Sequence, residues 1–198
     1  MALWKTRLRT GLRHPITTRI INSLAFYGGW SALVVNAAKG KPNQGLIILF
    51  ALMVLHFSLS HQRKKDVYFI LTVVVAGVAI DAAYMYVGAL EYMSPNQLVH
   101  GLPPLWMAGV YAIFAMSVDY SLFWLRFNLL LASIFGASGA ILSYRLGVAL
   151  GACKFLWPGL QTYYLIGAVW VLFMPLCTLY SEWLNSLMKL GRKPHAKN

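Results

Sequence analysis

The sequence predicts an all-α membrane protein, a six-helix transmembrane bundle with both termini in the cytoplasm. Of its 198 residues, 59% are hydrophobic and only 11% are charged, whereas about 25% of the residues in a soluble domain are charged. Six apolar stretches come close to the roughly 20 residues that a helix needs to cross a bilayer. The basic residues cluster between these stretches and near the two ends of the chain.

The expected spans are residues 20–38, 45–61, 67–88, 104–125, 129–150 and 160–184. Helices are required because lipid offers no hydrogen-bond partner to backbone N–H and C=O groups, and the alternation typical of a barrel strand is absent. The first span is too long for the apolar part of a signal peptide, so we expect it to stay in place. The connections are short, and residues 20–184 therefore form one expected transmembrane domain.

Two basic segments flank this domain. Residues 1–19 form a basic N-terminal segment, in which Trp4, Leu8 and Leu12 recur every four residues. That spacing is typical of a short helix on the membrane surface, and a mobile basic tail is an equally open interpretation. Residues 185–198 form a basic C-terminal tail.

The distribution of charge predicts the topology. The chain has 17 Lys and Arg residues against 5 Asp and Glu, a net charge of +12. The Lys and Arg residues lie in short clusters rather than over a folded surface, which argues against nucleic-acid binding. Most of them fall in the two tails and in the second and fourth loops, which share one side of a six-span protein. The positive-inside rule makes that side cytoplasmic, so we expect both termini of this multi-pass protein in the cytoplasm. The expected partners are membrane lipids and, as a further option, another membrane protein.

A few ionisable residues fall within the apolar spans. A charge at the centre of a span costs about 2.5 to 3.5 kcal/mol, and the apolar residues of the third span offset this cost for Asp81. Asp81 shares a helical face with Gly77, Tyr84 and Gly88, so we expect it to face the bundle interior.

Depth suggests partners for these groups. A rise of about 1.5 Å per residue places Asp81 and Arg145 at similar depths near the outer ends of their spans. Asp119 and His56 lie at similar depths near the inner ends. We expect an Asp81–Arg145 pair, with snorkelling of Arg145 as an equal alternative, and we consider an Asp119–His56 pair. A hydrogen bond from His56 to a neighbouring carbonyl is the stronger interpretation.

The fifth span carries a stripe of small residues. Gly139, Ser143, Gly147 and Gly151 recur every four residues, which lets another helix backbone approach closely. We interpret this face as a helix-packing surface, and a groove for a lipid or small molecule is the alternative.

Three segments resemble a known family. Residues 102–106 (LPPLW), 121–125 (SLFWL) and 136–152 are similar to those of an uncharacterised family of bacterial inner-membrane proteins, domain-of-unknown-function family 2878, over about residues 22–179. The matching positions are Asn22, Trp30, Asp81, Gly88, Pro104, Trp106, Trp124, Gly139, Ser143, Tyr144, Gly147 and Gly151. This chain departs from the pattern at Ala140-Ile141, where the family usually has Gly-Pro, and a kink in the fifth span is therefore in doubt.

The resemblance implies a small polytopic inner-membrane protein and supplies no activity. Members of the family often lie near genes for fatty-acid-modifying methyltransferases, which implies a link to lipids by association.

Three functions follow as hypotheses. The first is an accessory protein, linked to membrane lipid modification, whose polar residues specify packing. The second is a small transporter with an intramembrane polar path, and the third is an intramembrane lipid-modifying enzyme. The candidate residues for a substrate or polar path are Asp81, Arg145, Asp119, His56 and Tyr144. The sequence suggests no cofactor, and Cys153 and Cys177 lack the spacing of metal ligands.

Overall fold

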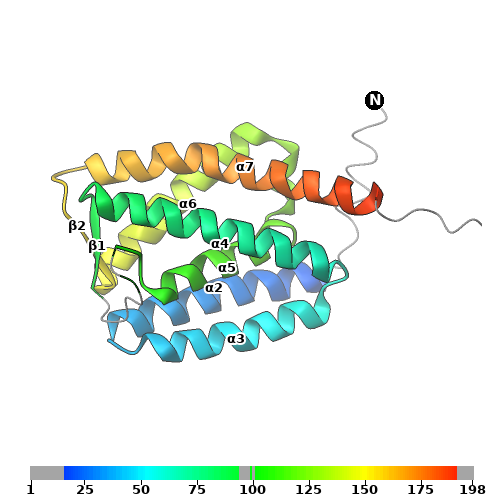
Figure 1. Cartoon of the computed structure of the whole chain (residues 1–198), viewed down its shortest axis with the longest axis horizontal. Coiled ribbons are helices and arrows are strands. Elements are labelled where there is room, and N and C mark those ends of the chain that lie inside the picture. The colour runs from blue at the N-terminus through cyan, green and yellow to red at the C-terminus, as the bar shows by residue number, and fades with distance from the viewer. Residues whose placement is uncertain (1–15, 94–98, 100, 191–198) are drawn as a thin grey trace, which may run out of the picture.

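The computed structural model describes residues 16–93, 99 and 101–190. The predicted surface helix in residues 1–19 lies mostly outside this range, as does the end of the basic C-terminal tail. The described chain forms an elongated bundle of helices that run roughly along its long axis (Figure 1). The start of the first helix and the end of the last lie at the same end of the bundle. We call this the terminal end and the other the sheet end.

The elements follow in the order α2 (Ile16–Ala38), α3 (Pro42–Leu59), α4 (Arg63–Tyr86), β1 (Leu90–Tyr92), α5 (Leu105–Val118), the 3-10 helix η1 (Phe123–Phe127), α6 (Leu129–Leu150), β2 (Cys153–Phe155) and α7 (Gln161–Leu190). The predicted all-α fold with six main helices is confirmed. Five of them, α2, α3, α4, α6 and α7, are long and apolar enough to span a membrane. Helix α6 has the predicted bounds, while α7 continues past the predicted end of the transmembrane domain.

Local signals fix both ends of α6. Asn128 precedes the helix, and its side-chain oxygen accepts a hydrogen bond from the backbone N–H of Leu131 at 3.1 Å, as an N-cap residue does. Gly151 follows the helix with a positive φ of 83°, a conformation that favours glycine. Gly151 therefore ends the helix and does not contribute to a packing face.

Helix α5 is shorter than predicted. The sequence suggested a span over residues 104–125, whereas α5 ends at Val118 after 14 residues. At about 1.5 Å per residue such a helix is roughly 21 Å long, less than the 30 Å or so of a bilayer core. The chain then turns and continues as η1.

A side chain from α2 ends α5. The Asn22 side-chain amide donates to the backbone carbonyl of Met116 at 3.0 Å. Its oxygen accepts from the backbone N–H of Ser121 at 3.3 Å and from the Ser121 hydroxyl at 2.8 Å. Within a continuing helix, this carbonyl and this N–H would bond to other backbone groups four residues away. The contacts with Asn22 replace those bonds, and the helix stops.

Helix α5 lies at the centre of the bundle. All but two of its residues are buried, the exceptions being Leu105 and Ala108. It contacts α2, α3 and α4, and its aromatic residues pack against α7. The other helices therefore surround α5.

Two short strands cover the sheet end. Strands β1 and β2 pair antiparallel, with Glu91 opposite Lys154 and Tyr92 opposite Cys153. Tyr92 and Cys153 are buried, while Glu91 and Lys154 are exposed and form an ion pair at 3.0 Å. The sequence analysis did not predict this sheet. It joins the α4–α5 connection to the α6–α7 connection (Figure 1).

The predicted stripe on α6 is only partly at a packing surface: Gly147 is buried and Ser143 bonds to Trp30 of α2, whereas Gly139 and Gly151 are exposed. An added Cβ at Gly139 would meet nothing within 4 Å, and Gly139 is exposed. Gly136 makes the close approach instead: an added Cβ would meet the side chain of Met174 and lie 2.9 Å from the carbonyl oxygen of Trp170. The buried residues of α6 also include Ala132, Ala140 and Gly147. The face that packs on α7 is therefore offset from the predicted stripe, because α7 rather than the stripe of small residues determines which side of α6 is buried.

Candidate functional site: two groups of buried polar residues

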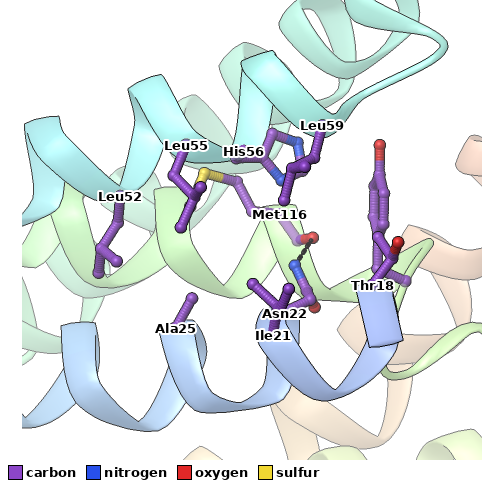
Figure 2. Close-up of a pocket in the computed structure, with 10 residues that line it drawn as sticks. Thr18, Ile21, Asn22, Ala25, Leu52, Leu55, His56, Leu59 and Met116 are labelled. Atoms are coloured by element: carbon purple, nitrogen blue, oxygen red, sulfur yellow. Dashed lines mark hydrogen bonds between the residues drawn. The ribbon is translucent and has the colours of Figure 1, made fainter. Parts of the chain in front are cut away.

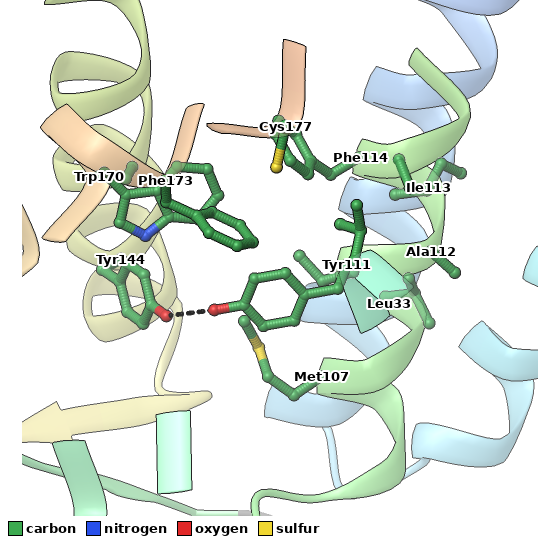
Figure 3. Packing of buried hydrophobic residues seen from close by; sticks show 14 of the residues in the cluster. Leu33, Met107, Tyr111, Ala112, Ile113, Phe114, Tyr144, Trp170, Phe173 and Cys177 are labelled. Atoms are coloured by element: carbon green, nitrogen blue, oxygen red, sulfur yellow. Dashed lines mark hydrogen bonds between the residues drawn. The ribbon is translucent and has the colours of Figure 1, made fainter. Parts of the chain in front are cut away.

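The first group is the Asp81 cluster, which consists of Asp81, Tyr92, Tyr111 and Tyr144 near the sheet end. Asp81 is completely buried, as its position on the face of Gly77 predicted. The Tyr144 hydroxyl donates to Asp81 Oδ1 at 2.5 Å. The Tyr111 hydroxyl lies 3.4 Å from that of Tyr144 (Figure 3). Asp81 also interacts with the side chains of Tyr92 and Tyr111.

Elements far apart in the sequence supply this cluster. Asp81 comes from α4, Tyr111 from α5, Tyr144 from α6 and Tyr92 from β1. Burial, and then the charge of Asp81, raises the pKa of Tyr92 well above its ordinary value. The Tyr144 hydroxyl therefore serves as a hydrogen-bond donor to the carboxylate, and the cluster joins three helices and the sheet.

Arg145 is not the partner of Asp81. Arg145 is exposed on α6, whereas Asp81 is inside the bundle. Neighbouring residues on a helix point about 100° apart, so only one of Tyr144 and Arg145 can face Asp81. The predicted ion pair is wrong, and the exposed position of Arg145 agrees with the snorkelling alternative.

A groove lies beside the Asp81 cluster. It encloses about 280 Å³, including the space open to its surroundings. Its lining includes Trp30, Trp106, Ser143 and Tyr144. The Trp30 indole N–H donates to the Ser143 hydroxyl at 2.8 Å and so links α2 to α6. The groove is therefore mainly aromatic, with tyrosines between it and the carboxylate.

The second group lies near the terminal end and has two parts. The first part is the Asp119 network, which consists of Lys65, Asp119, Arg126 and Ser181. The carboxylate of Asp119 bonds to Lys65 and accepts from the Ser181 hydroxyl. Arg126 Nη2 lies 2.6 Å from Asp119 Oδ1, and Lys65 Nζ lies 2.9 Å from Ser181 Oγ. Lys65 is 3% exposed, so it is a buried cation held by its partners.

The electrostatics of this network favour the ionised carboxylate. Burial of Asp119 opposes its ionisation, but the charges of Lys65 and Arg126 outweigh that effect and lower the pKa of Asp119 below its ordinary value of 3.8. Two cations therefore share one carboxylate where α4, α7 and the turn after α5 meet.

The second part is the His56 cluster, which consists of His56, Ser60, Asp66 and Tyr120. Asp66 Oδ2 accepts from the Ser60 hydroxyl at 2.6 Å and from the Tyr120 hydroxyl at 2.9 Å. His56 Nε2 lies 3.4 Å from the same oxygen. The predicted Asp119–His56 pair is wrong, because His56 faces Asp66 while Asp119 faces Lys65.

The sequence analysis missed Lys65, Asp66, Ser60 and Ser181. It began the third span at Val67 and so assigned Lys65 and Asp66 to a loop. A usable signal was present: an adjacent cation and anion immediately before a long apolar run fit the first turn of a helix whose end enters a bundle. Ser60 and Ser181 carry no comparable signal.

An apolar layer separates the two groups. Between Asp66 and Asp81 the buried residues of α4 are Phe69, Ile70, Val73 and Gly77. Asp81 follows Asp66 by fifteen residues, which corresponds to about 22 Å of helix. Aromatic rings from α5 and α7 fill the same level, with Phe114 5.2 Å from Trp170 and Trp170 5.1 Å from Phe173 between ring centroids (Figure 3). Of the five predicted polar-path residues, Asp81 and Tyr144 therefore lie on one side of this layer, Asp119 and His56 lie on the other, and Arg145 is on the surface.

The side chains of the two buried polar groups are suited to hydrogen bonding and to neutralising one another's charge. Within the described residues, no group of three His, Cys, Asp or Glu side chains could hold a metal ion. The His56 cluster combines an imidazole, a carboxylate and two hydroxyls beside a groove. Such a set can orient an imidazole and move a proton.

The fold and these clusters define a class: a helical, apolar bundle of membrane-protein type with buried polar groups at two levels. A family model described as "Protein of unknown function (DUF2878)" matches residues 19–176. The chain belongs to this family, as the sequence resemblance implied. No curated protein and no solved structure matches the chain.

Proposed function

We propose that the protein is an accessory inner-membrane protein, linked to membrane lipid modification, whose buried polar residues specify how the helices pack. One observation carries this proposal: the buried carboxylates Asp66, Asp81 and Asp119 all bond to protein groups from other helices or loops. Polar groups of this kind act as specific contacts between helices in a bilayer. The lipid link rests on the family resemblance.

The arrangement of charge supports cytoplasmic termini. Arg63, Lys64 and Lys65 begin α4 at the terminal end, and Arg126 shares the carboxylate of Asp119 with Lys65. Lys39 and Lys41 lie between α2 and α3, and Lys154 lies in β2, so these three belong to the opposite end of the bundle. Reporter fusions to either terminus test this topology, and a periplasmic position for either one would contradict it.

Lipid profiling tests the accessory role. Cells that lack the gene should show an altered lipid composition that the wild-type protein restores. We expect Asp119→Asn to lower the amount of protein and the restored lipid phenotype in parallel, because it breaks packing. Arg145→Gln should preserve both, because Arg145 is exposed. Loss of the lipid phenotype by Arg145→Gln at a normal protein level would contradict the proposal.

The apolar layer argues against the transporter hypothesis. A polar path needs its groups within reach of one another, whereas the Asp81 cluster and the Asp119 network lie at opposite ends of this layer. A solute flux that Asp81→Asn abolishes at an unchanged protein level would favour the transporter and contradict the accessory role.

The His56 cluster favours a second candidate, an intramembrane lipid-modifying enzyme. His56 lines a groove, and Asp66 and Tyr120 stand beside its ring. If the protein is an enzyme, His56→Gln should remove the lipid product while the protein accumulates normally. If it is an accessory protein, lipid composition should follow the amount of the His56→Gln protein.

A further inference from the structure

A groove between α2 and α3 has walls that change in character along its length. It is open to its surroundings, and its cavity volume is only about 20 Å³. Ala25, Leu52 and Leu55 line one part, whereas Thr18 and His56, together with Leu59, line the part nearer the terminal end (Figure 2). Tyr120, which packs against His56, also lines the groove. The walls are thus apolar toward the middle of the bundle and include polar groups toward its end. A phospholipid has the same order of chemistry, from acyl chain to glycerol esters.

Contacts inside the bundle hold the polar part in place. His56 is 7% exposed, and its ring packs edge-on against Tyr120 with centroids 4.9 Å apart. Asp66 lies behind both side chains. The imidazole and the phenol are therefore fixed on the wall of the groove, which lowers the entropic cost of binding a ligand there.

The charge around this end is positive. Arg63 is exposed, and its Nε donates to the Phe57 carbonyl at 2.8 Å, which places the guanidinium against the end of α3. Lys64 is exposed next to it, and Arg19 follows Thr18 on α2 with its guanidinium 4.0 Å from the Phe123 ring centroid. Basic groups at this level of a membrane helix bundle attract anionic lipid headgroups.

We infer that the groove between α2 and α3 binds a phospholipid with an anionic headgroup. An acyl chain lies along Ala25 and Leu55, the ester region lies at His56, and the phosphate lies near Arg63. This inference goes beyond the proposed function and needs only that the bundle lies in a bilayer. It applies equally to an accessory protein and to an enzyme.

Thermal unfolding of the full-length protein in detergent tests the inference, with phosphatidylglycerol or phosphatidylcholine added. Phosphatidylglycerol should raise the midpoint of wild type by several degrees and phosphatidylcholine by much less. Ala25→Phe fills the groove and should abolish the shift. Ala51→Phe is the matched control, because Ala51 is exposed on α3 and does not line the groove. An undiminished shift in Ala25→Phe, or equal shifts with both lipids, would overturn the inference.

A labelling experiment keeps the inference testable if Ala25→Phe does not fold. Leu55 lines the groove and is 42% exposed, while its neighbour Val54 is 52% exposed and lies outside it. Phosphatidylglycerol at ten times its dissociation constant should slow maleimide labelling of Leu55→Cys roughly tenfold, in proportion to the unoccupied fraction. Labelling of Val54→Cys should not change. Equal slowing at both positions would mean non-specific coverage by lipid and would contradict the inference.

The experiments distinguish a failure of the groove inference from a failure of the proposed accessory role. If phosphatidylglycerol does not bind while Asp119→Asn still lowers the amount of protein and the lipid phenotype together, the groove inference alone is wrong. If the lipid binds but Arg145→Gln removes the phenotype at a normal protein level, the accessory role alone is wrong.

Discussion

Single residues determine how closely the helices of this bundle approach one another. At Gly136, α7 lies so near that an added methyl group would meet Met174 and the Trp170 carbonyl. Gly139 is also on α6 but faces open space. The sequence shows that α6 is rich in glycine, but it does not show which glycine faces a neighbour, because that depends on where α7 lies.

Alanine at these two glycines should have opposite effects. Gly136→Ala should destabilise the protein by about 1 to 3 kcal/mol, because the new Cβ forces α6 and α7 apart. Gly139→Ala should stabilise α6 by about 0.5 to 1 kcal/mol, because alanine has the higher helix propensity. Thermal unfolding in detergent measures both. A lower midpoint for Gly139→Ala than for Gly136→Ala would mean that the predicted stripe is the packing face after all.

Removing the Tyr144 hydroxyl tests the Asp81 cluster. Tyr144→Phe removes the 2.5 Å hydrogen bond to Asp81 and leaves the buried carboxylate with one donor fewer. We expect a loss of about 1 to 3 kcal/mol in the free energy of unfolding. Tyr164→Phe is the control, because Tyr164 is 71% exposed on α7. Equal stability of the two variants would show that the hydroxyl contributes nothing.

The sequence placed Asp81 correctly and left two equal alternatives for Arg145, of which the ion pair with Asp81 is wrong. The cost of a charge in lipid was enough to place the carboxylate inside the bundle. Depth alone could not distinguish Tyr144 from Arg145, since the two are adjacent in the chain and differ in direction rather than in height. Lys65 was not considered as a partner of Asp119, because the sequence suggested that the third span begins at Val67 and so left Lys65 in a loop.

At the scale of elements, the long apolar helices were predictable and the short elements were not. Helix α6 has an N-cap asparagine and a terminal glycine at its ends, and its bounds matched. Helix α5 stops early because Asn22 of α2 bonds to Met116 and Ser121, a tertiary contact that hydropathy does not reveal. Strands β1 and β2 have three residues each and carry too short a pattern to recognise.

Side chains alternate between buried and exposed along β2, and this predicts that thiols at neighbouring positions of the strand differ in reactivity. Cys153 is buried, and burial raises the pKa of its thiol from 9.0 to about 12. Native Cys153 should therefore resist maleimide, because the thiolate is the reactive form. Lys154→Cys is the matched test, since Lys154 is exposed on the same strand. We expect one rapidly labelled thiol in Lys154→Cys and none in wild type before denaturation. Rapid labelling of the wild-type protein would contradict the assigned orientation of β2.

At the scale of the whole molecule, the Asp119 network holds α4, α7 and the turn after α5 together near the terminal end. Asp119→Asn should cost about 3 to 5 kcal/mol, because it leaves buried cations without their carboxylate. Glu91→Gln is the matched control, since it also removes a carboxylate from an ion pair, but one about half exposed at the sheet end. That change should cost less than about 1 kcal/mol. The midpoints of thermal unfolding give the comparison, and equal losses would contradict the role of burial.

The same network predicts a dependence on pH. The pKa of Asp119 is lower in the folded protein than its ordinary value of 3.8, so folding favours the ionised carboxylate. Its contribution is complete above pH 3.8 and is lost as the pH falls through the lowered pKa. The stability difference between wild type and Asp119→Asn should be constant from pH 7 to pH 5 and should shrink below about pH 4. A difference that grows on acidification would contradict this sign.

The position of α5 inside the bundle has a consequence for biogenesis. A segment that touches almost only protein, and is too short to cross by itself, gains little from contact with acyl chains at the moment of its synthesis. Its contacts are mostly with α2, α3 and α4, all of which are synthesised before it. The first three helices therefore provide the surface on which α5 settles as it leaves the ribosome.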